Sequence, residues 1–211
     1  MYCPEHFREE RLEVLHGLIK AHPLGLLVTA GRAGVIANLL PFTIHAEGER
    51  GTLRAHLARA NRQVDALKEA AETLVIFQGP ECYVSPGWYP TRAQDGRVTP
   101  SWNYTMVQVR GTPRVCDDRA WVRAQVEQMT DIHEGSRPAP WKVSEAPESH
   151  ISEMLNHIVG FEIPVRGIEG KWKISQNRTE AERDGVMSAL TEEQSCPAML
   201  ATMKARYEMK D

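Results

Sequence analysis

The amino-acid sequence predicts a mainly β protein with peripheral helices, an α+β fold built on a closed or partly closed antiparallel barrel. About seven segments have the apolar runs or alternating polarity that are typical of strands. Most of them follow one another across short turns that contain glycine or proline, as the strands of hairpins do. Helical periodicity is confined to other segments, so we expect the helices at the periphery of the barrel.

The N-terminal part predicts a helix, a meander of three strands and a second helix. Apolar residues recur at helical spacing within residues 9–21, and Pro23 ends the pattern. The expected elements that follow are strands 24–30 and 35–44 around a tight turn at 31–34, a turn at 47–51, a strand from residue 53, and a helix that starts just after Asn61 and ends near residue 71.

The rest of the chain alternates strands with helices. The expected elements are strands 74–77 and 82–85 separated by a break at Gly79-Pro80, a loop at 89–100, a strand at 102–116, a helix from an Asp117 N-cap to residue 130, a proline-rich loop at 134–146, a helix at 148–156, strands 158–165 and 167–174, and helices beyond residue 177. The 211 residues are ample for one main domain, residues 1–178, with a C-terminal helical extension, residues 179–211.

Composition and motifs exclude several classes of protein. A net charge of −3 argues against a globally basic nucleic-acid binder. The four cysteines form no C-x-x-C motif and no apolar signal peptide is present, so we expect reduced thiols and a cytoplasmic protein. No stretch is long and apolar enough to span a bilayer. We expect no metal site, because paired Cys/His spacings are missing, and G-x-G-x-x-G and Walker sequences are absent as well.

The turn after the strand that starts at residue 53 predicts a phosphate site. The free backbone N–H groups of a helix that starts after Asn61 would point toward an anion, and Arg59 and Arg62 add cationic donors beside them. A capped surface helix flanked by solvated arginines explains this stretch equally well.

Aromatic and amide side chains gather at three separate strand ends. These stretches are Tyr83 with Trp88-Tyr89, residues 101–104 (SWNY), and residues 172–178 (WKISQNR). Tryptophan and tyrosine can stack on a planar ring, and asparagine, glutamine and serine can orient it. Each stretch alone is more simply explained by barrel packing and turn chemistry. Together with the phosphate site, they suit a planar heterocycle that carries a phosphate.

Several ordered motifs resemble the PaiB family, which is described as FMN-binding negative transcriptional regulators. The motifs are residues 1–7 (MYCPEHF), 56–61 (HLARAN), 77–80 (FQGP), 83–86 (YVSP), 88–89 (WY), 99–104 (TPSWNY) and 170–178 (GKWKISQNR). The resemblance covers most of the chain. It implies a flavin split barrel similar to pyridoxamine-phosphate oxidases and flavin reductases, with residues 1–178 as the FMN-binding domain, and a homodimer with FMN in two clefts at the subunit interface.

The resemblance also implies a set of FMN-binding residues. Arg59, Ala60 and Asn61, with Arg62 and His56 beside them, occupy the place of the turn that holds the FMN phosphate, although Ala60 has no charge. The strand that passes the flavin ring carries Asn38 and Leu39. The late segment that reaches the flavin from the second subunit corresponds to Trp172, Ser175, Gln176 and Asn177, and the SWNY motif contributes Trp102, Asn103 and Tyr104.

The resemblance leaves three functions open. The first is a negative transcriptional regulator or flavin-dependent sensor with promoter DNA as a partner, although the sequence has no separate helix-turn-helix unit. The second is an FMN-dependent oxidoreductase or flavin reductase that uses NAD(P)H, and the third is haem binding or degradation. In the dimer we expect the partner to cover the apolar strand faces of residues 36–42 and 102–109.

Overall fold

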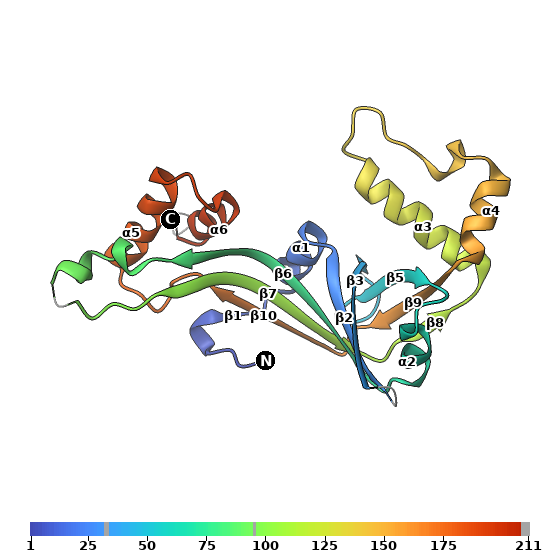
Figure 1. Ribbon diagram of the computed structural model, residues 1–211, viewed down its shortest axis with the longest axis horizontal. Coiled ribbons are helices and arrows are strands. Elements are labelled where there is room, and N and C mark those ends of the chain that lie inside the picture. The colour runs from blue at the N-terminus through green and yellow to red at the C-terminus, as the bar shows by residue number, and fades with distance from the viewer. Residues whose placement is uncertain (32–33, 95, 208–211) are drawn as a thin grey trace. The chain divides into compact units, whose positions relative to one another are not determined.

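The computed structural model describes residues 1–31, 34–94 and 96–207, which form two compact units (Figure 1). Unit 1 combines Met1–Leu18, Gln78–Val107 and Glu169–Asp211, and unit 2 combines Ile19–Phe77 and Gln108–Ile168. Neither unit is continuous in sequence, because the long strands β6 (Thr73–Val84) and β7 (Ser101–Gly111) contribute residues to both.

The strands form two sheets. The six-stranded sheet has the order β1 (Arg8–Glu9), β10 (Gly167–Lys173), β7, β6, β2 (Leu24–Gly31) and β3 (Gly34–Pro41). The four-stranded sheet has the order β4 (Thr43–His45), β5 (Thr52–Ala58), β9 (Ile158–Pro164) and β8 (Arg114–Cys116). The pairs β1–β10, β2–β3, β2–β6, β4–β5, β5–β9 and β8–β9 are antiparallel, which confirms the antiparallel sheet structure predicted from the sequence.

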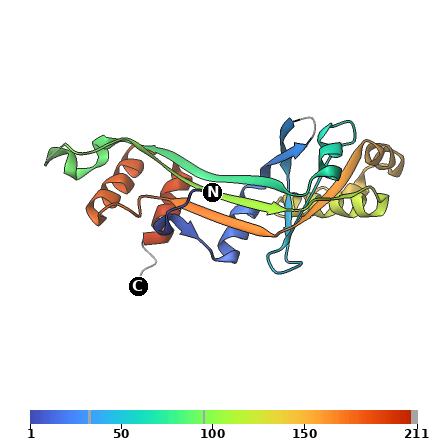
Figure 2. The same cartoon turned by 90° about the horizontal axis from the view of Figure 1, so that it is seen from below.

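Unit 2 has an aromatic core and three helices that pack on its strands. Phe42 contacts Phe77 and Phe161 edge to face, with ring centroids 5.6 and 5.9 Å apart. Helices α3 (Arg119–Glu134) and α4 (Glu148–Asn156) lie side by side and pack against β9, with the short helix η4 (Val143–Glu145) between them in sequence (Figure 1). Helix α2 (Gln63–Glu69) lies beside the β2–β3 pair (Figure 2).

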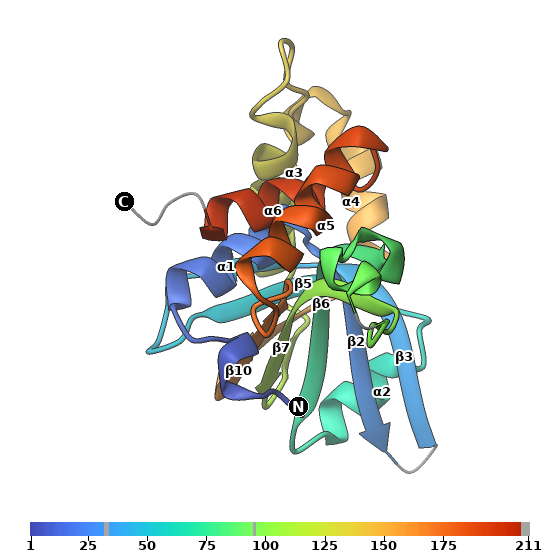
Figure 3. The same ribbon diagram turned by 90° about the vertical axis from the view of Figure 1, so that its left-hand side faces the viewer.

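Unit 1 is covered by the two C-terminal helices. Helices α5 (Glu180–Glu192) and α6 (Pro197–Tyr207) lie side by side (Figure 3) and bury Val186, Leu190, Met199 and Met203 against Ile174. The remaining helical segments are η1 (Glu5–Phe7), α1 (Leu12–Ala21), η2 (Pro86–Trp88) and η3 (Pro90–Ala93). No helix in the described part of the chain is long and apolar enough to cross a membrane.

The predicted break at Gly79-Pro80 is wrong, because β6 continues through both residues. A Cβ atom on Gly79 would lie 2.3 Å from Thr105 Oγ1 and 2.9 Å from a methyl group of Leu18. Glycine is therefore needed here for close packing inside a strand rather than for a turn.

The predicted N-cap of the third long helix is also wrong by one residue. Helix α3 begins at Arg119, and the Asp118 carboxylate accepts a hydrogen bond from the backbone N–H of Trp121 at 2.8 Å. Asp117 forms a pair with Arg59 instead. Of the predicted turn at 31–34, residues 32 and 33 lie outside the described residues.

Strand β3 is the edge strand of the six-stranded sheet and has no fully buried residue. Val35 and Leu39 are 72% and 60% exposed, although both are large and apolar. Among the other apolar positions that the sequence assigned to a partner surface, Ile36, Leu40, Trp102 and Met106 are also at least partly exposed, but three are not. Phe42, Val107 and Val109 are buried within the chain itself, so that part of the prediction is wrong.

Candidate functional site

The end of β5 in unit 2 holds the first group of predicted site residues. The Arg59 guanidinium donates two hydrogen bonds to Asp117, from Nη1 at 2.8 Å and from Nη2 at 2.6 Å. Further donors of this side chain reach the backbone carbonyls of Asn156 and Ile158. The guanidinium lowers the pKa of the Asp117 carboxyl group, so the pair is ionised at neutral pH. An anionic ligand at Arg59 would have to take the place of Asp117.

The turn between β5 and α2 is capped by Asn61. Its Oδ1 atom accepts the N–H of Gln63 at 2.9 Å, and its carbonyl oxygen accepts the N–H of Val64 at 3.0 Å. The helix therefore begins within two residues of the position that the sequence predicted. Two of its first N–H groups are already satisfied, which leaves fewer for an anion. Ala60 and Arg62 are exposed, and Arg62 makes no hydrogen bond or ion pair within the described chain.

Gln63 links α2 to the β2–β3 pair and was missed in the sequence. Its side chain is 0% exposed. Its Oε1 atom accepts a hydrogen bond from Asn38 Nδ2 at 2.8 Å, and its Nε2 atom lies 3.1 to 3.3 Å from the carbonyl oxygens of Leu27 and Ile36 and the hydroxyl of Thr29. The amide of Asn38 is thus fixed in orientation. Its Oδ1 atom has no partner among the residues described.

His56 faces a different element. Its Nδ1 atom lies 2.7 Å from Oε1 of Gln125, which is buried on α3. Asn38 and Arg62 instead belong to the β3 and α2 side of unit 2. The structure therefore does not join His56 to the Asn38–Gln63 pair through any hydrogen bond among the described residues.

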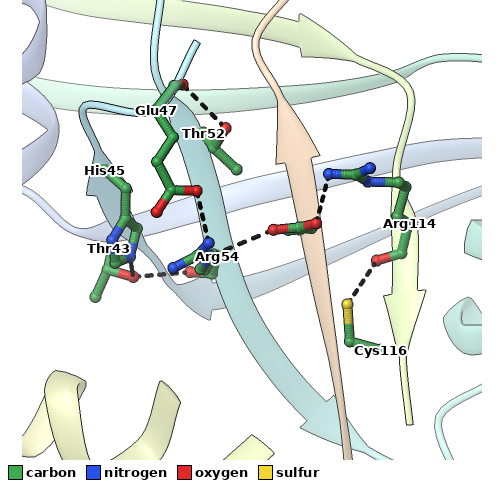
Figure 4. Close-up of polar contacts among 8 residues, drawn as sticks. Thr43, His45, Glu47, Thr52, Arg54, Arg114 and Cys116 are labelled. Carbon is green, nitrogen blue, oxygen red and sulfur yellow. Dashed lines mark hydrogen bonds and ion pairs between the residues drawn. The ribbon is translucent and has the colours of Figure 1, made fainter. Parts of the chain in front are cut away.

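A charged cluster on the four-stranded sheet is a second feature that sequence reasoning missed (Figure 4). Glu162 on β9 accepts hydrogen bonds from Arg54 at 3.3 Å and Arg114 at 2.6 Å, and Arg54 also pairs with Glu47. Next to them, burial and the positive charge of Arg54 lower the pKa of His45, whose ring lies 2.9 Å from the Thr43 hydroxyl. Two arginines and two carboxylates balance, so this cluster joins the strands and offers no free charge to a ligand.

The second group of predicted site residues lies in unit 1, and two of its members are buried. Asn103 Nδ2 donates to Ser175 Oγ at 3.0 Å, and Ser175 Oγ donates to Asn103 Oδ1 at 3.2 Å. Ser175 has a positive φ of 70°, which few residues other than glycine adopt. These two hydrogen bonds hold the turn at Ser175 against β7. Both side chains therefore stabilise the interior of unit 1.

The other members of the second group lie nearer the surface. Gln176 uses its amide within its own turn, accepting from the N–H of Ile174 and donating to the carbonyl of Trp172. Trp102 is 52% exposed and contacts Tyr83 edge to face. Tyr104 lies against the Lys171 ammonium group at 5.2 Å, and Asn177 is exposed.

The sequence matches the family model described as "Putative FMN-binding domain" over residues 1–167. The chain belongs to this FMN-binding family. A protein of Emericella nidulans, named only as uncharacterized, is 33% identical over 100% of this chain and 99% of its own. The Bacillus subtilis "Protease synthase and sporulation protein PAI 2" is 27% identical over 92% of this chain and 91% of its own. The PaiB-type resemblance and the FMN cofactor expected from the sequence are thereby confirmed.

The fold of this FMN-binding protein also resembles a solved structure. The FAD and heme binding protein of Mycobacterium smegmatis superimposes with a TM-score of 0.60 over 79% of this chain and 73% of that chain, at 16% sequence identity. This likeness shows the fold, a flavin-type split barrel, and confirms the predicted fold class.

The β3 and α2 side of unit 2 offers groups that fit FMN. Asn38 presents a fixed amide, and Leu39 presents an exposed apolar side chain next to it. Within the described residues, the Asn38 acceptor is free and the Arg62 cation is unpaired. A cavity of about 390 Å³ lies beside Arg62, with Asp65 and Glu69 also in its wall. FMN supplies reversible one- and two-electron chemistry when it is bound. In this chain, Asn38 and Leu39 would contact the ring, and Arg62 would contact the phosphate.

Proposed function

We propose that this FMN-binding protein is a homodimer that holds FMN noncovalently in two equal clefts and uses it as a flavin-dependent sensor or negative regulator of transcription. The resemblance of the sequence motifs to the PaiB family of negative transcriptional regulators supports the regulatory role, and the Bacillus subtilis relative is named for protease synthase and sporulation. The observation that carries the proposal is the edge strand β3, where the fixed amide of Asn38 alternates with exposed apolar side chains.

Strand β3 is suited to a partner subunit. An edge strand that has no neighbouring strand on one side and that exposes Val35 and Leu39 is a surface that proteins normally cover. A two-fold contact between two β3 strands would cover both at once and would build two identical sites. FMN would then lie between subunits, with Asn38 and Leu39 of one subunit on one side of the ring.

The partner would supply the other wall of each cleft. The predicted site residues divide into a group in unit 2 and a group in unit 1. Because Asn103 and Ser175 are buried, the exposed members Trp102 and Asn177 are the ones that can reach a flavin of the other subunit.

The phosphate would lie at Arg62 and Arg59, with Asp117 as an internal competitor. Asp117 presents two oxygens to the Arg59 guanidinium, as a phosphate would. The phosphate of FMN would displace this carboxylate or share the guanidinium with it. Asp117→Asn keeps the size of the side chain and removes its charge, so it should strengthen FMN binding without affecting riboflavin.

The dimer and the cleft are tested together by Leu39→Arg. Three proteins are reconstituted with FMN and run on gel filtration: wild type, Leu39→Arg, and the control Ile132→Arg, which places the same charge at an apolar residue of α3 that is 56% exposed. We expect wild type and the control to be dimers that carry FMN, and Leu39→Arg to be a monomer without it. A Leu39→Arg protein that remains a dimer with bound FMN would refute the proposed interface.

The phosphate site is tested by comparing FMN with riboflavin in fluorescence-quenching titrations. Arg62→Ala should weaken FMN by about tenfold, since the loss of one charge-assisted hydrogen bond is of that order. Its affinity for riboflavin should stay at the wild-type value. Equal losses for both ligands would mean that Arg62 does not contact the phosphate.

The regulatory role is tested against the enzymatic one with the FMN-loaded protein. Binding to promoter fragments that weakens steeply as salt rises supports a regulator, because contacts to DNA phosphates release counterions. Rapid anaerobic reduction by NADH or NADPH without DNA binding would favour an FMN-dependent oxidoreductase. The absorption spectrum of the same sample would reveal a haem in place of the flavin.

Two further parts of the proposal concern organisation and location. Residues 1–178 would form the FMN-binding domain, and residues 179–211 would form a helical extension whose helices pack on it through Ile174. All four cysteines are free thiols, which suits a reducing compartment, and we place the protein in the cytoplasm.

A further inference from the structure

A cavity of unit 1 that is separate from the β3 strand has a positively charged wall. Its volume is about 530 Å³, within the range of small-molecule sites. Arg8 and Arg11 come from β1 and the residues after it, and Arg206 comes from the last turn of α6. Among the lining residues that the structure describes, Glu9 is the one carboxylate. Three guanidinium groups thus face one carboxylate in a protein whose net charge is −3.

Arg11 occupies both oxygens of the Glu9 carboxylate. Glu9 is 7% exposed and accepts hydrogen bonds from Nε, Nη2 and the backbone N–H of Arg11, at 2.9, 2.7 and 3.0 Å. These bonds lower the pKa of Glu9 and fix the Arg11 guanidinium in the wall of the cavity. Arg11 Nη1 has no partner within the described chain.

The guanidinium groups of Arg8 and Arg206 are available to an anionic ligand. Arg206 makes no hydrogen bond or ion pair with any residue that the structure describes. Arg8 has a single contact at 3.6 Å with Glu10, and both of these side chains are more than half exposed. Such an exposed pair contributes little, so its arginine can turn to another anion.

The remaining wall is mixed, because Gln176 and Thr202 are polar whereas Val14, Trp172 and Ala205 supply apolar surface. Trp172 and Val14 line the cavity, and Trp172 is held in place because the Gln176 amide donates to its carbonyl and its ring packs over Gly170. An indole ring offers a stacking surface to a planar ligand. The guanidinium fork matches the two oxygens of a carboxylate.

We propose that this cavity binds a small aromatic carboxylate, with the carboxylate on Arg206 and Arg11 and the ring against Trp172. The site needs neither FMN nor a second subunit, because every lining residue belongs to unit 1 of one chain. Trp172 and Gln176 also belong to the late segment that the family resemblance assigns to FMN, so competition with FMN decides whether this cavity is a separate site.

The test is isothermal titration calorimetry of the full-length protein with benzoate. Two further ligands separate the contribution of the carboxylate from that of the ring: acetate has the carboxylate alone, and benzyl alcohol has the ring without the charge. Arg206→Gln removes one cation from the exposed end of α6, and Lys204→Gln is the matched control, because Lys204 lies on the same turn outside the cavity wall.

We expect benzoate to bind in the millimolar range or more tightly, and acetate and benzyl alcohol to bind about tenfold more weakly. Arg206→Gln should weaken benzoate by about tenfold, and Lys204→Gln should leave it unchanged. The proposal is overturned if benzoate gives no heat, if both variants behave alike, or if saturating FMN abolishes benzoate binding, since the cavity would then belong to the flavin site.

Discussion

The buried amide of Gln63 gives a stability prediction that can be worked out from the structure. In Gln63→Leu, a side chain of similar size replaces one that is 0% exposed. The packing is then kept while the hydrogen bonds are lost. Asn38 Nδ2 loses its acceptor, and the carbonyl oxygens of Leu27 and Ile36 lose a donor.

The expected loss is about 3 kcal/mol in the free energy of unfolding. The two N–H groups and one oxygen of the Gln63 amide account for three hydrogen bonds, each contributing about 1 kcal/mol net. Buried groups left without a partner raise the cost, and the greater hydrophobicity of leucine offsets part of it. For a chain of this size the melting temperature should fall by roughly 6 to 12 °C.

Urea unfolding monitored by circular dichroism measures this loss. The control is Gln128→Leu, which makes the same replacement at an exposed position of α3 and should change the free energy of unfolding by less than about 0.5 kcal/mol. If Gln63→Leu is no less stable than the control, the Gln63 amide does not hold α2 to β2 and β3. A Gln63→Leu protein that is folded should also bind FMN more weakly, because Asn38 is no longer fixed.

Three other predictions concern pH, thiol reactivity and packing. Burial lowers the folded-state pKa of His45 below its ordinary value of 6.5, so the unfolded chain binds more protons as the pH falls below that value. The free energy of unfolding should therefore decrease from neutral to mildly acidic pH, and urea titrations of His45→Gln should show a smaller decrease. Burial also raises the pKa of Cys82 to about 12 and leaves the side chain 2% exposed, so Ellman's reagent should label at most three of the four thiols until the chain is unfolded. In Gly160→Ala the new Cβ would lie 2.2 Å from the ring of Trp121, so thermal melting should show a loss of about 1–3 kcal/mol. Gly17→Ala, where a Cβ meets nothing within 4 Å, should instead be neutral or stabilising in the same assay.

Each of these three has an outcome that would contradict it. A stability profile unchanged by His45→Gln would mean that other groups govern the acid range. Four thiols labelled at one rate in the folded protein would mean that Cys82 is accessible. A Gly160→Ala protein as stable as wild type would mean that Trp121 moves aside at no cost.

Local patterns in the sequence predicted most elements of the fold. The helix expected at 148–156 coincides with α4, because an acidic first turn after Pro147 and one apolar stripe define it locally. Helix α1 and strands β9 and β10 were likewise predicted within a few residues. The errors at Gly79 and Asp117 have a common reason. Both depend on contacts between residues that are distant in the sequence. Gly79 packs against Thr105 and Leu18. Arg59 pairs with Asp117 across 58 residues, which leaves Asp118 as the cap.

The candidate site was predicted less completely than the fold. Motif resemblance selected Asn38 and Arg62, but the sequence does not say that Gln63 is buried, because its partners lie 25 to 36 residues away. The Glu162 cluster was missed for the same reason, since Arg54 and Arg114 come from two other strands. Pairing of charges across strands depends on register, which a single sequence specifies only weakly.

The division of each unit into separate chain segments sets an order for folding during synthesis. Unit 2 has all of its residues once Ile168 has left the ribosome, whereas unit 1 needs Glu169–Asp211 as well as the first 18 residues. The N-terminal segment therefore cannot complete its packing until β10 is made, because Leu15 lies over Gly170 of that strand. A ribosome stalled only after Ile168 has emerged from the exit tunnel would display a compact unit 2 and a protease-sensitive N-terminal segment, and release of the finished chain would protect that segment.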